Sequence, residues 1–488
     1  MIENDLKRWL FMGERPGEEA MLKIKLALAT AASALIMATS ATAQTSELAP
    51  LPHFDPNTVP PAADVIAAMK REASAEVARL KAIDAAPDTA RANGGGITPN
   101  WVSATFLIGA NRLTRMADAP DVQDYSFRVA QRFNYALRTG AAPVNLLNAD
   151  DQALGDVYED LYLRTGLPGV LMPLQQRLDY SAPYLEKSPQ PKRLIWWWCD
   201  ALFMAPPVLV RMSAITGDPK YIKAMDVQWW RTYDRLWDDK EHLFARDERF
   251  VTRVDDNGKK IFWSRGEGWV LAGLARLLET MPADFPSRPR YVKVYQQMAA
   301  RIITLQQPDG LWRTNLLDTQ AFPEAETSGT ALDTFALAFG INHGLLDRAT
   351  YLPHVTRAWA GLHDYILPSG ILGQVQTGGD QPVPTRRETI GLYASGAYLL
   401  AGSEVAKLND PIASLPLAIT APKTMTFVAS DIGPSRPPAT PAEEKEAQRK
   451  VLERQAIKDL AYDPVTDDPD YTPVYNMGTK VKKQGTVK

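Results

Sequence analysis

The chain has 488 residues but only one cysteine, Cys199, and five scattered histidines. A single cysteine excludes an intrachain disulfide. No H-x-x-x-H pattern or Cys/His cluster occurs, which argues against a structural zinc site or a zinc protease. The net charge is only −3, so nothing indicates binding to nucleic acid or to an anionic membrane surface. These absences leave a globular protein that depends on neither disulfides nor structural zinc.

A long hydrophobic run is also missing, but the N-terminal region has the order of a secretory signal. Two lysines precede an apolar run over 26–37, and small residues then lead to Ala41-Thr42-Ala43. The run is shorter than the ~20 residues of a transmembrane helix, and A-x-A is the pattern of a cleavage site. We expect a signal peptide over 21–43, with residues 1–20 an upstream start-site extension. We therefore expect cleavage after Ala43 and export to a periplasm. The alternative is that the segment stays uncleaved as a membrane anchor.

Composition divides the remaining chain into three parts. Residues 44–62 are rich in Pro and polar residues, which is typical of a linker. Residues 63–407 carry apolar residues at helical spacing and form the predicted domain. Residues 408–488 turn to Pro, Ala and Thr and then to dense charge, so we expect a C-terminal extension that is partly helical or disordered.

Helices are predicted in pairs along 63–407. After short turns, second helices are expected over 221–236, 291–306 and 351–366, with a period of roughly 50–65 residues. About six such pairs fit the segment, which predicts an all-α barrel of concentric helices with its site in the loops at one end. An open α-solenoid is the alternative, although long irregular loops favour a closed barrel.

One segment alternates as strands do. Arg249–Val254 and Lys259–Phe262 flank Asn257-Gly258, and an Asn-Gly pair favours the tight turn of a β-hairpin. We therefore expect one small β-hairpin in an otherwise helical protein.

The most apolar stretch contains one carboxylate. Asp200 follows Trp196-Trp197-Trp198-Cys199 and precedes Ala201-Leu202-Phe203-Met204. Burying a bare charge is costly, so such a group is normally paired or held protonated. A carboxylic acid protonated near neutral pH is what a general acid requires. The other interpretation, compatible with the first, is that Asp200 caps the helix beginning at Ala201.

Polar residues precede two further predicted helices. Asp150 and Asp151 lie before one, where acids can simply favour the positive end of the helix dipole. Thr327 and Ser328 begin another, where hydroxyls cap helices but also bind sugar carboxylates together with backbone N–H groups.

Arg265 stands between Trp263 and Trp269, with glycines on either side of Glu267. A guanidinium among indoles suits a sugar that carries a carboxylate, because it offers a bidentate fork and a stacking plane. The alternative is a structural ion pair with an Asp or Glu.

Five motifs in this order resemble glycoside hydrolase family 105, the unsaturated rhamnogalacturonyl hydrolases, and more distantly the unsaturated glucuronyl hydrolases of family 88. The resemblance covers roughly residues 60–407 and implies an (α/α)6 barrel. The motifs are Asn148-Ala149-Asp150-Asp151-Gln152, Trp198-Cys199-Asp200-Ala201-Leu202-Phe203-Met204, Phe262-Trp263-Ser264-Arg265-Gly266-Glu267-Gly268-Trp269, Glu326-Thr327-Ser328-Gly329-Thr330 and Tyr393-Ala394-Ser395-Gly396-Ala397-Tyr398-Leu399-Leu400-Ala401-Gly402-Ser403-Glu404.

The resemblance implies a reaction and roles for residues. An oligosaccharide ending in a 4,5-unsaturated uronic acid would be hydrated at its double bond, with Asp200 protonating C4 and then accepting a proton from the water that attacks C5. Asp150 is implied as the second catalytic carboxylate, with Asp151 as its rival and a substrate-binding candidate. The other implied substrate-binding residues are Trp101, Trp263, Arg265, Trp269, Thr327 and Ser328.

One departure from the family pattern concerns the choice of sugar. Some relatives carry a histidine where this chain has Phe244-Ala245-Arg246-Asp247-Glu248, so the role of that histidine is absent here or is taken by Arg246 or Asp247. Unsaturated galacturonyl-rhamnose, as in pectin, is the default, and unsaturated glucuronyl linkages stay open. We expect an oligosaccharide partner, no cofactor or metal, and a monomer or weak homo-oligomer.

Three other functions are compatible with parts of the pattern. An inverting hydrolase of saturated sugars could use Asp150 and Asp200 as its two carboxylates. A sugar epimerase needs paired histidines, which the sequence does not offer. A non-catalytic sugar-binding protein would keep the tryptophans and would not depend on Asp200.

Overall fold

The structure, a computed structural model, describes residues 52–85, 97–138, 146–187 and 194–409. The predicted signal peptide, its cleavage site, the start-site extension and most of the C-terminal extension lie outside these residues. Within the described part, no helix combines the length and hydropathy needed to cross a membrane.

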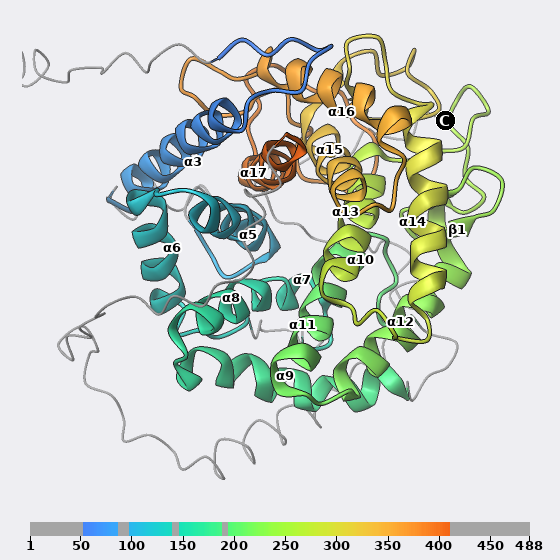
Figure 1. The fold of residues 1–488 in the computed structure, drawn as a ribbon. Coiled ribbons are helices and arrows are strands. Elements are labelled where there is room, and N and C mark those ends of the chain that lie inside the picture. The colour runs from blue at the N-terminus through green and yellow to red at the C-terminus, as the bar shows by residue number, and fades with distance from the viewer. Residues whose placement is uncertain (1–51, 86–96, 139–145, 188–193, 410–488) are drawn as a thin grey trace, which may run out of the picture. The chain divides into compact units, whose positions relative to one another are not determined.

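Among the described residues, six inner helices form a closed ring (Figure 1). The last of them, α17, packs against the first, α5, which closes the ring. This closure decides for the barrel and against the open solenoid. The inner helices are α5 (Trp101–Met116), α8 (Gly155–Thr165), α11 (Pro206–Thr216), α13 (Ser264–Thr280), α15 (Thr327–Asn342) and α17 (Leu392–Val405).

A second layer of six helices surrounds this ring in the described residues (Figure 1). Inner helices such as α15 and α17 are buried along nearly their whole length, whereas outer helices such as α12 bury one face and expose the other. The predicted (α/α)6 barrel is therefore confirmed. The outer helices are α3 (Ala62–Ala85), α6 (Pro120–Arg132), α9 (Pro168–Glu186), α12 (Lys220–Leu236), α14 (Arg288–Ile303) and α16 (Arg348–His363).

Each outer helix returns the chain, so the inner helices run in one direction and their N-termini gather at one end. Three of the family motifs lie where inner helices begin. The other two contain short helices that precede inner helices. These are α7 (Ala149–Gln152) before α8 and α10 (Ala201–Met204) before α11. The topology thus brings distant motifs to one end of the barrel.

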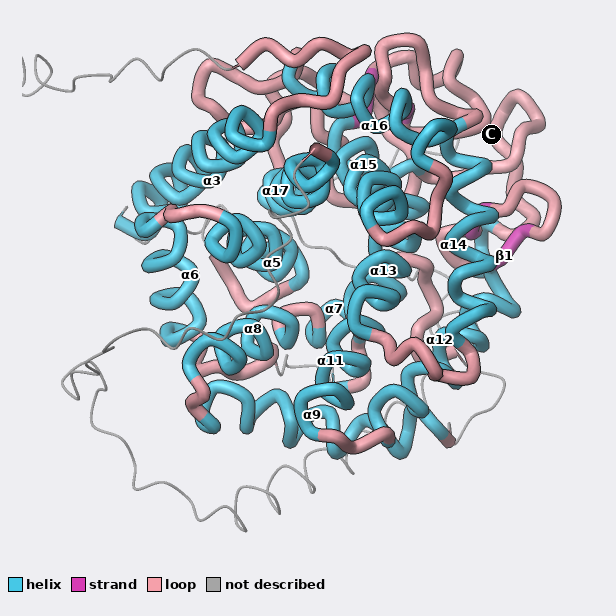
Figure 2. Tube along the Cα trace, viewed as in Figure 1, coloured by secondary structure: helices cyan, strands magenta, loops and turns pink. Residues whose placement is uncertain are grey.

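Strands are few and short in the described residues (Figure 2). β1 (Trp237–Asp238) pairs with β2 (Leu243–Phe244), and β3 (Trp312–Arg313) pairs with β4 (Ala325–Glu326), both antiparallel. Short 3-10 helices, η2 (Glu248–Phe250) and η3 (Ala406–Leu408), complete the described elements.

The predicted β-hairpin over Arg249–Val254 and Lys259–Phe262 is wrong as a pair of strands. Its turn is present, with Gly258 at a φ of 73°, but only an isolated bridge joins Val254 to Lys260. The Asp247 side chain accepts a hydrogen bond from the Arg249 N–H and starts η2, which uses residues that the pattern assigned to a strand.

The described end of the predicted linker is packed on the barrel. Phe54 is buried, with its ring centroid 5.8 Å from that of Trp359 on α16. The Thr356 hydroxyl donates to the Pro56 carbonyl at 2.7 Å. This segment therefore covers an outer helix.

Candidate active site

Asp200 occupies the position before α10 but does not cap it. Its backbone is helical, with φ −59° and ψ −28°, and its side chain accepts no capping hydrogen bond. The capping interpretation is therefore wrong. The carboxylate turns instead to the Cys199 thiol, 3.6 Å from Oδ2, and to Nε of Arg246, 3.3 Å from Oδ2.

The surroundings of Asp200 favour its protonated form. Only 8% of the residue is exposed, and burial raises its pKa, while Arg246 and Arg265 oppose the rise. Glu267 on α13 is fully buried as well; burial raises its pKa well above the usual range, and the nearby charge of Asp200 adds to this effect. A carboxyl whose pKa is raised in this way donates and recovers a proton more readily than an ordinary aspartate does.

The segment after β2 holds Arg246 against the acid. The Cys199 N–H donates to the Arg246 carbonyl at 2.8 Å, and a single bridge pairs Trp198 with Asp247. Both oxygens of Glu267 accept from the Phe244 N–H, at 3.1 and 3.0 Å, and so fix β2 to α13. Arg246 is only 2% exposed, so the structure makes it the counterion of Asp200.

Asp150 and Asp151 lie on α7, which packs against α10. Asn148 caps α7 by accepting from the Asp150 N–H at 2.8 Å. Asp151 is buried, and burial raises its pKa to about 7 against the opposing charges of Arg138 and Arg177, whereas Asp150 is half-buried. Both acids therefore belong to the element beside Asp200, and the choice between them stays a prediction.

Arg265 has partners that the sequence did not indicate. Its two Nη atoms donate to main-chain carbonyls, to Gln376 at 2.7 Å and to Thr377 at 2.9 Å. Its guanidinium also lies over the rings of Trp263 and Tyr393, 4.6 and 4.9 Å from their centroids. No ion pair involves Arg265 among the described residues, so the alternative of a structural Asp or Glu pair is wrong. The guanidinium of Arg265 instead holds the loop that contains Gln376 and Thr377 in place.

The three predicted stacking tryptophans differ in accessibility. Trp263 is buried and donates from Nε1 to the Gln376 side chain at 2.9 Å. Trp269 is buried between Phe203 and Trp101, with ring centroids 4.6 and 6.0 Å away. Trp101 is half-buried, so it exposes more of its surface than the other two do and is the best placed of the three to contact a sugar ring.

Ser328 already binds a carboxylate of the chain itself, and Thr327 binds a main-chain carbonyl. Glu326 accepts from the Ser328 N–H and hydroxyl, at 3.0 and 2.6 Å, and from the Gly329 N–H. The Thr327 hydroxyl donates to the Gly373 carbonyl at 2.7 Å. The predicted donors for a sugar carboxylate are thus engaged within the protein, because Glu326 caps α15.

Sequence reasoning missed four residues around this site. Cys199 and Glu267 lay inside quoted motifs, as did Tyr393, but none had been given a role. Gln376, which links Trp263, Arg265 and Tyr393, had no sequence signal at all. Within the described residues, no group of three or more His, Cys, Asp or Glu side chains could hold a metal ion.

Comparisons with known proteins agree with this geometry. The chain is 40% identical over 326 residues, 64% of this chain and 85% of the other, to the "Unsaturated 3S-rhamnoglycuronyl hydrolase" of Formosa agariphila. It is 32% identical over 349 residues, 68% and 83% of the two chains, to the protein of the same name from an Alteromonas species.

A solved structure shares the fold. "Glycosyl hydrolase family 88 from Bacteroides vulgatus" matches with a TM-score of 0.63 and 27% identity, over 71% of this chain and 99% of that chain. Residues 66–409 match Glycosyl Hydrolase Family 88, the second of the two families that the motifs resemble. The chain is therefore a glycoside hydrolase and belongs to Glycosyl Hydrolase Family 88.

Proposed function

We propose that this glycoside hydrolase removes a 4,5-unsaturated uronic acid from the non-reducing end of oligosaccharides by hydrating the double bond. The observation that carries the proposal is the setting of Asp200, a buried carboxyl with a raised pKa at the end of the barrel where the inner helices begin. Hydration of an enol ether needs one group that first donates and then accepts a proton.

The proposed reaction proceeds in balanced steps. Protonated Asp200 gives its proton to C4, and the positive charge that develops at C5 is shared with the ring oxygen. Water adds to C5 and returns a proton to Asp200, leaving a hemiketal. The hemiketal opens, and the leaving sugar departs as an alcohol. The carboxylate formed in the first step is stabilised by Arg246, 3.3 Å away.

The relatives' names support a finer substrate. Both say "3S-rhamnoglycuronyl", which favours a glycuronyl-rhamnose linkage of that kind over the galacturonyl-rhamnose of pectin. Arg246, where some relatives carry histidine, is the residue we expect to distinguish the two. Trp101 is proposed to stack on a sugar ring, with Asp150 or Asp151 holding its hydroxyls.

The location of the enzyme is proposed from the sequence. The apolar run over 26–37 and the A-x-A site support export and a mature start at Gln44. N-terminal sequencing of protein recovered from the periplasmic fraction tests this, and an intact Met21 or Met1 there would contradict it.

Asp200→Asn tests the function. We expect kcat to fall by about 10²–10⁴-fold, the usual contribution of a general acid, because Asn cannot donate a proton to C4. The assay follows the loss of absorbance of the double bond in unsaturated glucuronyl- and galacturonyl-rhamnose disaccharides. Asp124→Asn removes an exposed carboxylate on outer helix α6 and should keep full activity.

Two results would contradict the proposal. One is an Asp200→Asn variant that retains most of its activity. The other is a wild-type enzyme that leaves the unsaturated disaccharides intact and cleaves their saturated counterparts, which would favour a two-carboxylate inverting hydrolase.

A further inference from the structure

A chain of alternating charges connects Asp200 to the surface of the barrel. Asp200 is paired with Arg246, and Nη1 of Arg246 reaches Oδ2 of Asp247 at 2.9 Å. Arg249 binds both oxygens of Asp247, at 2.9 and 2.7 Å, and its Nη2 also reaches Asp380 at 2.7 Å. The first pairs are buried, whereas the Arg249 side chain is 40% exposed and that of Asp380 is 21% exposed.

Asp380 belongs to a loop whose other end is anchored at the same site. The Gln376 and Thr377 carbonyls accept from Arg265, and the Gln376 side chain accepts from Trp263. Within the loop, Nε2 of Gln376 donates to the Gln381 carbonyl at 3.0 Å. Segment 376–381 is therefore fixed to α13 by Arg265 and to the charged chain by Asp380, so its position and the charge near Asp200 are linked.

The inner carboxylate of the chain stays charged. Burial opposes ionisation of Asp247, but hydrogen bonding to Arg249 and the charge of Arg246 outweigh it and hold its pKa below the usual range. Hydrogen bonding to Asp247 raises the pKa of Arg249, and Asp380 adds to this. Arg246 therefore has a permanent anion on one side and Asp200, the group that must change its charge, on the other.

We infer that Arg249 and Asp380 are positioning residues that set the protonation of Asp200 through Asp247 and Arg246. The inference rests on the proposed function, in which Asp200 is the acid. Removing the Asp380 charge draws Arg249 toward Asp247 and frees Arg246 to stabilise the Asp200 carboxylate. Removing the Arg249 charge leaves Asp247 to compete for Arg246 and to repel that carboxylate.

Other groups also face Asp200, but none of them changes in these variants. They are the Cys199 thiol beside it, Arg246 on the segment after β2, and Arg265 and Glu267 on α13; helix α7, which packs against α10, carries Asp150 and Asp151. Both variants break the Arg249–Asp380 pair, so shifts in opposite directions report the charged chain and not a movement of the loop.

The test is the pH dependence of kcat/KM on an unsaturated disaccharide, since activity is lost as pH rises through the pKa of the acid. In Asp380→Asn we expect the alkaline limb to move down by about half a pH unit, and in Arg249→Gln up by a similar amount. These are the effects of partly screened charges that lie four and three ion pairs from Asp200 along the chain. Arg249→Lys keeps the charge and should stay near the wild-type limb. Asp124→Asn, which removes the partner of a surface arginine on α6, should not move it.

A second readout does not depend on turnover. The ¹³C carboxyl signal that disappears in Asp200→Asn gives the titration of Asp200 directly, and it should shift in the same directions. The inference is overturned if Asp380→Asn and Arg249→Gln are folded, as judged by their thermal midpoints, but change neither the alkaline limb nor the titration of Asp200. The Arg249–Asp380 pair would then only hold the loop in place. If the titrations shift but no unsaturated disaccharide is consumed by wild-type enzyme, the proposed function fails and the coupling stands.

Discussion

Several carboxyl side chains of this barrel are buried, and burial favours their protonated form. Asp200, Asp151 and Glu267 at the site all have raised pKa values with burial as the largest cause. Glu72 on α3, which packs against α17, repeats the pattern away from the quoted motifs. Burial, more than any one partner, sets the acidity of these groups.

Glu72 gives a prediction about stability and pH. Burial and the neighbouring Glu76 raise its pKa from 4.5 to about 8, so the folded state holds a proton that the unfolded state has lost above pH 4.5. Stability should therefore fall as pH rises from about 5 to 8. Glu72→Gln removes this pH-dependent contribution to stability. The free energy of unfolding of the variant, relative to that of the wild type, should therefore increase by about 2–4 kcal/mol between pH 5 and pH 8.

Thermal or urea unfolding at pH 5 and pH 8 measures the effect. Glu186→Gln, at an exposed position near the end of α9, is the matched control and should show no growing difference. A Glu72→Gln advantage that is the same at both pH values would mean that Glu72 is ionised in the folded protein.

At the scale of elements, closure of the inner ring depends on glycine. Gly109 on α5 and Gly396 on α17 face each other where the first and last inner helices meet. A Cβ at Gly396 would overlap the Thr105 carbonyl, and one at Gly109 would overlap the Gly396 carbonyl. The obstacles are backbone atoms, so neither helix can yield without moving as a whole.

Gly396→Ala is expected to destabilise the protein by about 3 kcal/mol, because the added methyl group separates α5 from α17. Gly169→Ala is the matched control, since no atom lies near its Cβ position on the exposed face of α9. That change should be neutral or stabilise by up to ~1 kcal/mol. Equal midpoints in urea for the two variants would contradict the close approach.

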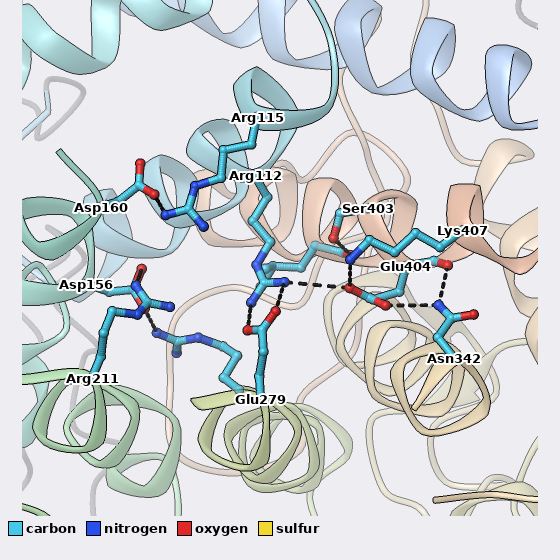
Figure 3. A network of polar contacts seen from close by, with 12 residues as sticks. Arg112, Arg115, Asp156, Asp160, Arg211, Glu279, Asn342, Ser403, Glu404 and Lys407 are labelled. Carbon is cyan, nitrogen blue, oxygen red and sulfur yellow. Dashed lines mark hydrogen bonds and ion pairs between the residues drawn. The ribbon is translucent and has the colours of Figure 1, made fainter. Parts of the chain in front are cut away.

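At the scale of the described barrel, the two ends of the inner ring have different roles. N-termini, which carry the positive end of the helix dipole, gather at the candidate site, and C-termini with the negative end gather opposite. Polar contacts between side chains of the inner helices form separate groups, two of which share helix α13 (Figure 3). One group joins Arg112 on α5, Glu279 on α13, Glu404 on α17 and Asn342 on α15, and the other joins Asp156 on α8, Arg211 on α11 and Arg276 on α13.

Arg112 is the centre of the first group. It binds Glu279 through both Nη atoms and lies 3.6 Å from Glu404, which in turn accepts from Asn342 at 2.9 Å. Asp156 joins Arg211 at 3.0 Å and Arg276 of α13 at 2.7 Å. These arginines therefore connect neighbouring inner helices through carboxylates.

Arg112→Gln should lower the free energy of unfolding by about 1–3 kcal/mol at pH 7, since it removes the bidentate partner of the partly exposed Glu279 and leaves the buried Glu404 with Lys407 as its cation. Burial opposes ionisation of Glu279, but Arg112 outweighs it and lowers its pKa to about 2. The stabilisation is therefore present above about pH 4.5 and lost as pH falls toward 2, so the difference from wild type should shrink at pH 3.

Unfolding at pH 7 and pH 3 measures this prediction, and the pH profile of kcat/KM should stay unchanged. Arg128→Gln, in an exposed pair on α6, is the control and should cost less than ~1 kcal/mol. A penalty of the same size at both pH values would show that Arg112 contributes packing and not charge.

Local pattern was enough to predict the helices, because apolar spacing records which face of each helix is buried. Lys220–Leu236 and Arg348–His363 fall within a few residues of the predicted ranges 221–236 and 351–366. The predicted hairpin at 249–262 was wrong because an Asn-Gly turn is a local signal, whereas a strand needs a hydrogen-bonded partner strand. Here Asp247 caps the short helix η2, which takes residues assigned to the first strand.

The sequence by itself determined the paired helices and the placing of Asp200 in apolar surroundings, because periodicity and composition are properties of neighbouring residues. Its motifs resembled two related families, and the choice of a closed barrel over an open solenoid came with the packing of α17 against α5. Only the tertiary structure decided which groups meet: Arg246 with Asp200, Arg265 with the Gln376 and Thr377 carbonyls, and Trp263 with the Gln376 side chain. Those contacts join residues from separate helices and loops, which are far apart in the sequence and come together only in the folded chain. Chemistry at this site therefore depends on contacts that exist only after the ring of helices has closed.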